Sequence, residues 1–157
     1  MNGMTLGPFT GYFRNRESTK NIKYPYNSYV GHFVLGIIYS RNEEHLDEQK
    51  IYTLDEILRI PSVIKDFQLF VHEKWRIASD KPGSGNTQNI GSVKEIDKLL
   101  NGEGPFVEYG EEIFDDYWMY YLTNDMARSI SLAQPPYSNL EEYFRYKNIG
   151  VKKNGEN

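Results

Sequence analysis

Apolar positions along the chain change their spacing from one segment to the next, and the spacing predicts the elements. The run Phe33–Tyr39 is continuous, apolar and rich in β-branched residues, which predicts a strand buried on both faces. Apolar and polar residues then alternate from Phe67 to Ile77, which predicts a strand or a bent pair of strands over about residues 67–78. Residues 4–13 mix Gly, Pro, Thr and aromatics and predict a short strand or a bent loop.

Helical signals lie mostly later in the chain. Thr53-Leu-Asp-Glu56, Ser92-Val-Lys-Glu95 and Ser138-Asn-Leu-Glu141 each fit a capping box, so a short helix is expected after each. A longer helix is expected over about residues 109–128. Strands followed by helices indicate an α+β fold with a mixed β-sheet. The length of 157 residues suits a single domain, expected over residues 1–149 with a polar tail at 150–157.

The segment Asp80–Asn89 is rich in Gly, Ser and Asn, which predicts a loop. Its glycines suggest phosphate binding, but no Gly-Lys-Ser/Thr follows at the spacing of a nucleotide-binding loop. From composition alone, a surface turn is the commoner outcome for such a stretch.

Charge is unevenly distributed along the chain. The net charge is −4, but residues 1–41 carry +4, residues 42–125 carry −10 and residues 126–157 carry +2. A polyanion would therefore meet the two ends of the sequence rather than its middle, although a solvated charged surface explains the pattern equally well. The longest apolar run is far shorter than the roughly 20 residues of a spanning helix, and no signal peptide is visible, so we expect a cytoplasmic protein.

Catalytic and metal-binding motifs are not evident. The chain has no cysteine, and His32, His45 and His72 lack the spacing of a helical zinc site, so we expect the two strand-associated histidines, His32 and His72, to be hydrogen-bonded structural residues. The acidic pairs 111–112 and 115–116 fall on a predicted helix and favour a solvent-facing surface over a metal site. Glu48-Gln49-Lys50 is a lone Asp/Glu-x-Lys match without a preceding strand acid, so we assign it no catalytic role.

Several longer motifs together resemble the EcoRV family of type II restriction endonucleases. The similarity extends from Thr5 to about Tyr146, with order and spacing largely preserved. The segments that carry it include Thr5-Leu-Gly, Thr19-Lys-Asn-Ile, Tyr24-Pro, Ile38-Tyr-Ser-Arg41, Lys74-Trp-Arg-Ile-Ala78, Gly83-Ser-Gly-Asn-Thr87, Asn89-Ile-Gly-Ser92, Gly102-Glu-Gly104 and Phe114-Asp-Asp-Tyr-Trp118.

The resemblance implies a restriction-endonuclease-like fold and a homodimer that binds a short DNA palindrome, GATATC or a close relative. It also implies that the loop within residues 80–92 reads bases in the major groove. The base-reading residues are then Gly83, Ser84, Gly85, Asn86 and Thr87. Glycine lets the backbone approach base edges, Asn can pair bidentately with adenine, and the Thr methyl can contact thymine.

Further positions match residues of the family that contact the DNA backbone or lie near it. These are Thr10, Lys20, Arg41, Asn89, Tyr121 and Arg128. Gly11 replaces a serine of the family, so a hydroxyl contact to phosphate is expected to be lost, and Thr123 replaces a second arginine, which is expected to weaken DNA contact on that side. Such contacts supply position and salt-dependent affinity rather than sequence choice.

The family's metal-binding acids and catalytic lysine precede the Thr-Leu-Gly segment, which here begins at Thr5. No catalytic residue and no Mg²⁺ ligand is therefore identified in this sequence, although the family uses Mg²⁺. We expect this polypeptide not to cut DNA alone. A DNA-binding remnant without catalysis, or one half of a split enzyme that pairs with a separate N-terminal fragment, is the alternative. Without the strands of that segment, the run Phe33–Ile38 is expected to expose an edge or a face.

Overall fold

The structure is a computed structural model that describes residues 3–19, 22–43, 47, 49–83 and 88–148. The chain divides into two compact units. Unit 1 comprises Met1–Val34 together with His72–Asn157, and unit 2 comprises Leu35–Val71. The single domain expected over residues 1–149 stays a prediction.

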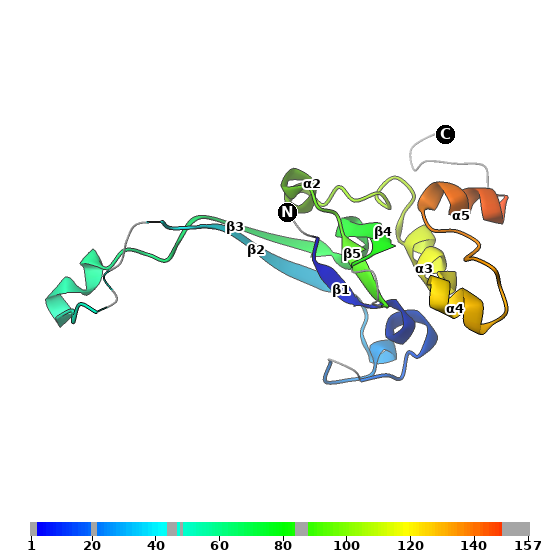
Figure 1. The fold of residues 1–157 in the computed structure, drawn as a ribbon, viewed down its shortest axis with the longest axis horizontal. Coiled ribbons are helices and arrows are strands. Elements are labelled where there is room, and N and C mark those ends of the chain that lie inside the picture. The colour runs from blue at the N-terminus through cyan, green and yellow to red at the C-terminus, as the bar shows by residue number, and fades with distance from the viewer. Residues whose placement is uncertain (1–2, 20–21, 44–46, 48, 84–87, 149–157) are drawn as a thin grey trace. The chain divides into compact units, whose positions relative to one another are not determined.

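Unit 1 contains a three-stranded antiparallel sheet in the order β1-β5-β4 (Figure 1). Its strands are β1 (Thr5–Pro8), β4 (Ala78–Pro82) and β5 (Asn89–Ser92). Ser92 is the last residue of β5, and its Oγ accepts a hydrogen bond of 2.7 Å from the Met4 N–H, so this oxygen does not cap a helix. The capping box expected at Ser92 is therefore wrong, and helix α2 (Ile96–Asn101) begins after Glu95 instead.

Helices α3 (Glu111–Tyr120), α4 (Asn124–Ser129) and α5 (Leu140–Lys147) follow the sheet in sequence. The single helix expected over 109–128 is thus two helices, because the Thr123 side chain caps α4 by accepting from the Met126 N–H at 3.2 Å. The last helix begins one residue later than expected, since Asn139 is its cap and accepts from the Glu142 N–H at 2.9 Å.

Aromatic side chains form much of the core of unit 1. Trp118 and Tyr117 on α3 are completely buried, as is Phe9, which follows β1. The Phe9 ring centroid lies 5.2 Å from that of Trp118. After β1 the chain enters η1 (Thr10–Arg14), a π-helical turn, so residues 4–13 combine the expected short strand with a helical bend. Burial of these rings joins the N-terminal segment to α3.

Unit 2 is built on two paired strands, β2 (Phe33–Arg41) and β3 (Ile64–Glu73), of which residues 33–34 and 72–73 are counted in unit 1. The predicted second strand begins earlier than expected and ends at Glu73, because Lys74–Ile77 form a helical turn, α1. The capping box at Thr53 is confirmed. It opens the 3-10 helix η3 (Leu54–Arg59), with the Thr53 N–H donating to Glu56 Oε2 at 3.1 Å.

The expectation that Phe33–Tyr39 is buried on both faces is wrong. Alternate side chains of β2 are exposed, with Leu35 at 64% and Ile37 at 52%, because among the described residues this strand pairs with β3 in a two-stranded sheet rather than lying between other layers. The exposed face expected for the run Phe33–Ile38 is thus observed. The ring of Phe70, a residue that is 5% exposed, fills the space that a side chain at position 36 would need, so Gly36 allows this close packing.

Short antiparallel sheets and helices confirm the α+β class expected from the sequence. Within the ranges that the structure describes, no helix has both the length and the apolar character needed to cross a bilayer.

Candidate nucleic-acid interface

The predicted base-reading loop connects two neighbouring antiparallel strands. β4 ends at Pro82 and β5 begins at Asn89, and the Gly83 N–H donates to the Asn89 carbonyl at 3.0 Å. Ser84, Gly85, Asn86 and Thr87 lie outside the described residues. Because β4 and β5 are paired, the loop leaves and re-enters the sheet at one place, which defines its stem.

Asp80 fastens the incoming side of the stem to two helices. Its carbonyl accepts from the Tyr117 hydroxyl at 2.6 Å, and its Oδ2 accepts from the Leu140 N–H at 3.1 Å. The second bond places a carboxylate at the first turn of α5, where exposed backbone N–H groups favour negative charge. β4 is thereby held to both α3 and α5 close to the start of the loop.

Gln88 fastens the outgoing side of the stem to the N-terminal segment. Its carbonyl accepts from the Phe9 N–H at 2.8 Å, and its Oε1 accepts from the Thr10 hydroxyl at 2.8 Å. The structure therefore brings Thr10 together with the two ends of the loop, Gly83 and Asn89. These residues lie 73 and 79 positions after Thr10 in the sequence. A role for Gln88 in this site was not predicted from the sequence. The signal in the sequence is its position directly after the motif Gly83-Ser-Gly-Asn-Thr87.

Close packing leaves the stem little freedom. A Cβ added to Gly83 would lie 2.6 Å from Thr5 Cγ2, and one added to Gly91 would lie 2.6 Å from the Lys81 carbonyl oxygen. Real Cβ atoms do not approach other atoms so closely, so these glycines allow β1, β5 and β4 to meet at the base of the loop.

The other residues predicted to contact or approach the DNA backbone differ in their exposure and in the unit to which they belong. Arg128 is exposed on α4 and lies 3.4 Å from Asp125 Oδ1. Arg41 is exposed at the end of β2, in unit 2. Tyr121 is only 6% exposed, and burial raises its pKa to about 12, so little of its surface is open to a phosphate. Lys20 lies outside the described residues.

Arg14 belongs to the basic N-terminal segment and is exposed overall, yet its guanidinium is hydrogen-bonded to main-chain carbonyls. Its Nε donates to the Met119 carbonyl at 2.9 Å, and its Nη2 donates to the Tyr121 carbonyl. These carbonyls lie at the C-terminal end of α3, where a cation is favourable. Burial lowers the pKa of this guanidinium. The positive charge counted for residues 1–41 is therefore partly structural.

Lys74 begins the motif Lys74-Trp-Arg-Ile-Ala78 and is a buried cation. It is 8% exposed, and burial lowers its pKa to about 8. Its Nζ lies 4.0 Å from the centroid of the Tyr12 ring, and the Tyr12 hydroxyl is hydrogen-bonded to Nδ1 of His32. Burial, followed by the charge of Lys74, lowers the pKa of His32 to about 4.

Histidine and carboxylate placement in the described residues does not form a metal site. No group of three or more His, Cys, Asp or Glu side chains there could hold a metal ion. His72 Nε2 is hydrogen-bonded to the Leu100 carbonyl at 2.8 Å, so the expectation that His32 and His72 are hydrogen-bonded is confirmed, while His45 lies outside the described residues. The Mg²⁺ used by the family has no ligand set among the described side chains, and we derive no metal-dependent step.

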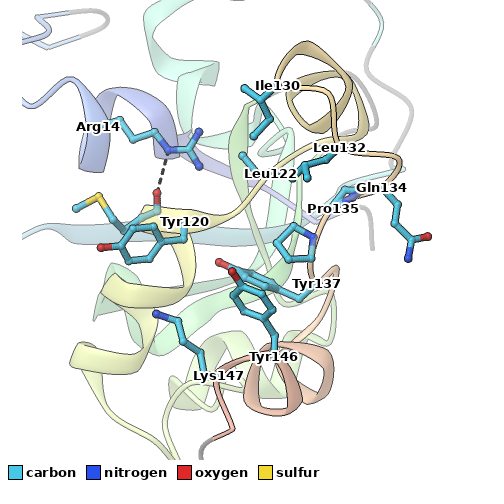
Figure 2. Close-up of a pocket in the computed structure, with 12 residues that line it drawn as sticks. Arg14, Tyr120, Leu122, Ile130, Leu132, Gln134, Pro135, Tyr137, Tyr146 and Lys147 are labelled. Carbon is cyan, nitrogen blue, oxygen red and sulfur yellow. Dashed lines mark hydrogen bonds between the residues drawn. The ribbon is translucent and has the colours of Figure 1, made fainter.

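A pocket of about 730 Å³ lies between α3 and the segment that leads to α5 (Figure 2). Its walls are mainly apolar and include Leu122, Leu132 and Pro135, with Tyr137 at one side. Lys147 lines it too, but its Nζ already lies 2.7 Å from Asp116 Oδ2. Arg14 lines the pocket as well, and its guanidinium donates to the Met119 and Tyr121 carbonyls, so both cations of this mainly apolar lining already have partners.

Comparison with known proteins agrees with the motifs and with the fold. The chain matches the family described as "Restriction endonuclease EcoRV" over residues 1–148. It is 39% identical over 140 residues to the type II restriction enzyme EcoRV of Escherichia coli, and the match covers 88% of this chain and 54% of that enzyme. The chain therefore spans about half the length of this curated relative. On the family match and the shared identity, the chain belongs to the EcoRV restriction endonuclease family.

Proposed function

We propose that this chain carries the DNA-recognition role of an EcoRV-type type II restriction endonuclease. In this proposal the loop Gly83–Thr87 reads base edges in the major groove of a GATATC-like palindrome. Thr10, Lys20, Arg41, Asn89 and Arg128 contact or lie near the DNA backbone, and Tyr121 lies close to it. Two copies of the chain bind the two halves of the site as a homodimer.

The observation that supports this proposal most directly is the fastened stem of the loop. Asp80 holds one side to α3 and α5, and Gln88 holds the other side to Phe9 and Thr10. A loop that reads bases must have its ends fixed, because hydrogen bonds to base edges require strict geometry and a small error in position breaks them. The family match adds the expectation that the ligand is DNA.

The energetics of the loop favour selectivity. Ordering a residue costs roughly 1–2 kcal/mol, while a good bidentate base contact returns about 1–3 kcal/mol. Because these amounts are close, the loss of one correct contact is enough to make the ordered complex unfavourable. Discrimination then comes from the loop, and general affinity comes from the basic residues.

Mg²⁺-dependent cleavage of both DNA strands is part of this proposal as the activity of the family. Metal-bound water is the usual nucleophile in such chemistry. We assign no residue of this chain to that step. A restriction role requires access to DNA in the cell, so we expect a cytoplasmic location.

Two substitutions in predicted contacts test the proposal, both at residues outside the described ranges. Asn86→Ala should lower the ratio of affinities for a GATATC duplex and a duplex with one changed base pair, by about fivefold or more, because a base contact is removed. Lys20→Ala should weaken binding to both duplexes equally and reduce the slope of log affinity against log salt by about one. Fluorescence anisotropy over a salt series measures both effects.

Matched controls are available on α2. Asn101→Ala and Lys98→Ala make the same chemical changes at exposed positions of this helix and should leave the affinity ratio and the salt slope unchanged. If Asn86→Ala and Lys20→Ala behave like the parent chain on every duplex, the assigned DNA surface is wrong.

A further inference from the structure

Lys74 carries a buried positive charge that no acid of the described residues neutralises. The residue is 8% exposed, and burial lowers its pKa with no carboxylate acting against it. The contact that the structure gives its Nζ is the face of the Tyr12 ring, 4.0 Å from the ring centroid. A ring face attracts the charge but accepts none of the three N–H donors of an ammonium in the usual way. Buried donors are normally hydrogen-bonded, so these donors call for an acceptor.

The hydroxyl of Tyr26 is a second donor in the same place. Tyr26 is 6% exposed. Burial, followed by the nearby Tyr29, raises its pKa, so the hydroxyl keeps its proton at neutral pH. Among the described residues, no hydrogen bond to this hydroxyl contributes to that shift. Tyr26 therefore adds a buried proton donor to the buried ammonium.

Gly7 brings these two groups to one side of the main chain. A Cβ built on Gly7 would lie 3.6 Å from the Tyr26 hydroxyl oxygen and 3.7 Å from Lys74 Nζ, so the two polar atoms border the same point. Gly7 has a φ of 95°, which disfavours any residue with a side chain between them. Hydrogen bonds of about 2.8 Å to two oxygens of one tetrahedral oxyanion can span the separation of the two donors.

The ammonium is held in position by its neighbours. The Lys74 N–H donates to the His32 carbonyl at 2.8 Å, and the Tyr12 hydroxyl is hydrogen-bonded to Nδ1 of the same histidine. The Tyr12 ring centroid lies 4.3 Å from that of His32 and 5.1 Å from that of Tyr26. The donors are thus fixed before a ligand arrives, which reduces the entropy lost on binding.

The chemistry of this cluster selects an anion. Lys74 can only donate hydrogen bonds, and its charge repels a cation. Burial, then the charges of Asp115 and Glu111, raises the pKa of Tyr12. Neither carboxylate raises the pKa of Lys74, which burial alone lowers. Lysine is a common ligand of phosphate groups, so a phosphate-type oxyanion supplies both the charge and the acceptors that the two donors require.

We propose that Lys74 and Tyr26, beside Gly7, form a binding site for a phosphate-type oxyanion. The ligand is inorganic phosphate or a phosphodiester of a nucleic-acid backbone, since both present the same tetrahedral arrangement of oxygens. The site does not rest on the proposed function, because none of its three residues is assigned to base reading or to the predicted DNA-backbone contacts. It has no part in cleavage.

Phosphate titration of the full chain, followed by NMR of ¹³C-labelled lysine side chains at pH 7, tests the site. Sodium phosphate is compared with sodium chloride at equal ionic strength, and the Cε signal of Lys74 is identified by its loss in Lys74→Met. Tyr26→Phe removes the hydroxyl and keeps the ring. Lys98→Met and Tyr24→Phe make the same changes at exposed positions and are the matched controls.

Phosphate should shift the Lys74 signal with a Kd of about 1–10 mM, as expected for a few charge-assisted hydrogen bonds. Chloride should leave the signal in place. Phosphate at about 50 mM should also raise the melting temperature of the parent chain by about 3–6 °C relative to chloride. Lys74→Met should abolish this rise, and Tyr26→Phe should weaken binding by about three- to tenfold. Both controls should respond like the parent, and melting in chloride alone shows that each variant is folded.

Short DNA duplexes distinguish the two sources of the oxyanion. If a phosphodiester is the ligand, a duplex shifts the Lys74 signal, and Lys74→Met reduces the slope of log affinity against log salt by about one. If inorganic phosphate is the ligand, the duplex leaves the signal in place while phosphate still shifts it. Either result supports the site.

Equal effects of phosphate and chloride on the parent chain would overturn the inference. So would a Lys74→Met chain that phosphate stabilises as much as the parent. A chain that responds to phosphate but binds no DNA refutes the proposed function and leaves this site standing, so the two failures are distinguishable.

Discussion

Replacement of the buried Lys74 by methionine should stabilise the chain at neutral pH and remove a pH dependence. Burial lowers the pKa of this lysine from 10.5 to about 8, a difference of about 2.5 pH units, which corresponds to an upper limit of about 3 kcal/mol at roughly 1.4 kcal/mol per unit. The ammonium lies 4.0 Å from the centroid of the Tyr12 ring, and this contact returns about 1–2 kcal/mol. The expected gain for Lys74→Met at pH 7 is therefore about 1–2 kcal/mol in the free energy of unfolding.

The sign of the pH dependence follows from proton binding. Between about pH 8 and pH 10.5 the unfolded chain keeps the proton on Lys74 while the folded chain has lost it, so the stability of the parent rises with pH through this window. Buried tyrosines act in the opposite direction above about pH 10, because burial raises the pKa of Tyr12 and of Tyr143 in the folded chain. The difference between parent and variant isolates the lysine, and it should shrink as pH rises from 8 to 9.5.

Urea denaturation followed by tryptophan fluorescence at several pH values between 7 and 9.5 measures this difference. Lys98→Met, at an exposed position of α2, is the matched control and should show no change with pH. A gap that stays constant over the range, or a Lys74→Met chain that is less stable than the parent at pH 7, would refute the argument that desolvation dominates at this site.

Three further predictions concern unit 2, the aromatic core and catalysis. Gly36→Ala should lower the free energy of unfolding by about 1–3 kcal/mol in urea denaturation, because its Cβ would lie 2.0 Å from Cζ of Phe70; adding Phe70→Leu should recover part of the loss. Tyr137→Phe should cost about 1 kcal/mol by the same assay, because the buried hydroxyl donates to the Tyr117 carbonyl at 2.7 Å. The 157-residue chain incubated with Mg²⁺ should leave supercoiled plasmid intact on a gel, and site-specific double-strand cuts would contradict our expectation about cleavage.

Local sequence patterns predicted the features that depend on neighbouring residues. The Gly- and Asn-rich segment after Asp80 is the connection between two strands, as its composition indicated. The capping box at Thr53 opens a helical turn. A turn or cap is decided by a few adjacent residues, so its signal is present in a short window.

Errors in the prediction occur where distant residues compete for the same groups. Ser92 fits a helix cap by sequence, but its hydroxyl is used by the Met4 N–H in the sheet. The apolar run that contains Leu35 indicated burial on both faces, whereas the strand pairs with one neighbour and exposes that side chain. Propensity is a weak local term, and tertiary pairing overrides it.

The amino-acid sequence by itself determined the α+β class, the place of the glycine-rich loop and the family to which its motifs point. Only the tertiary structure decided what holds that loop. Thr10 and Gln88 meet although 77 residues separate them, and Asp80 reaches the N-terminus of α5 from 60 positions away. Such partners are set by strand pairing and by packing of the aromatic core, and neither leaves a periodic signal in the sequence, because a hydrogen bond depends on where two groups lie in space and not on their distance along the chain.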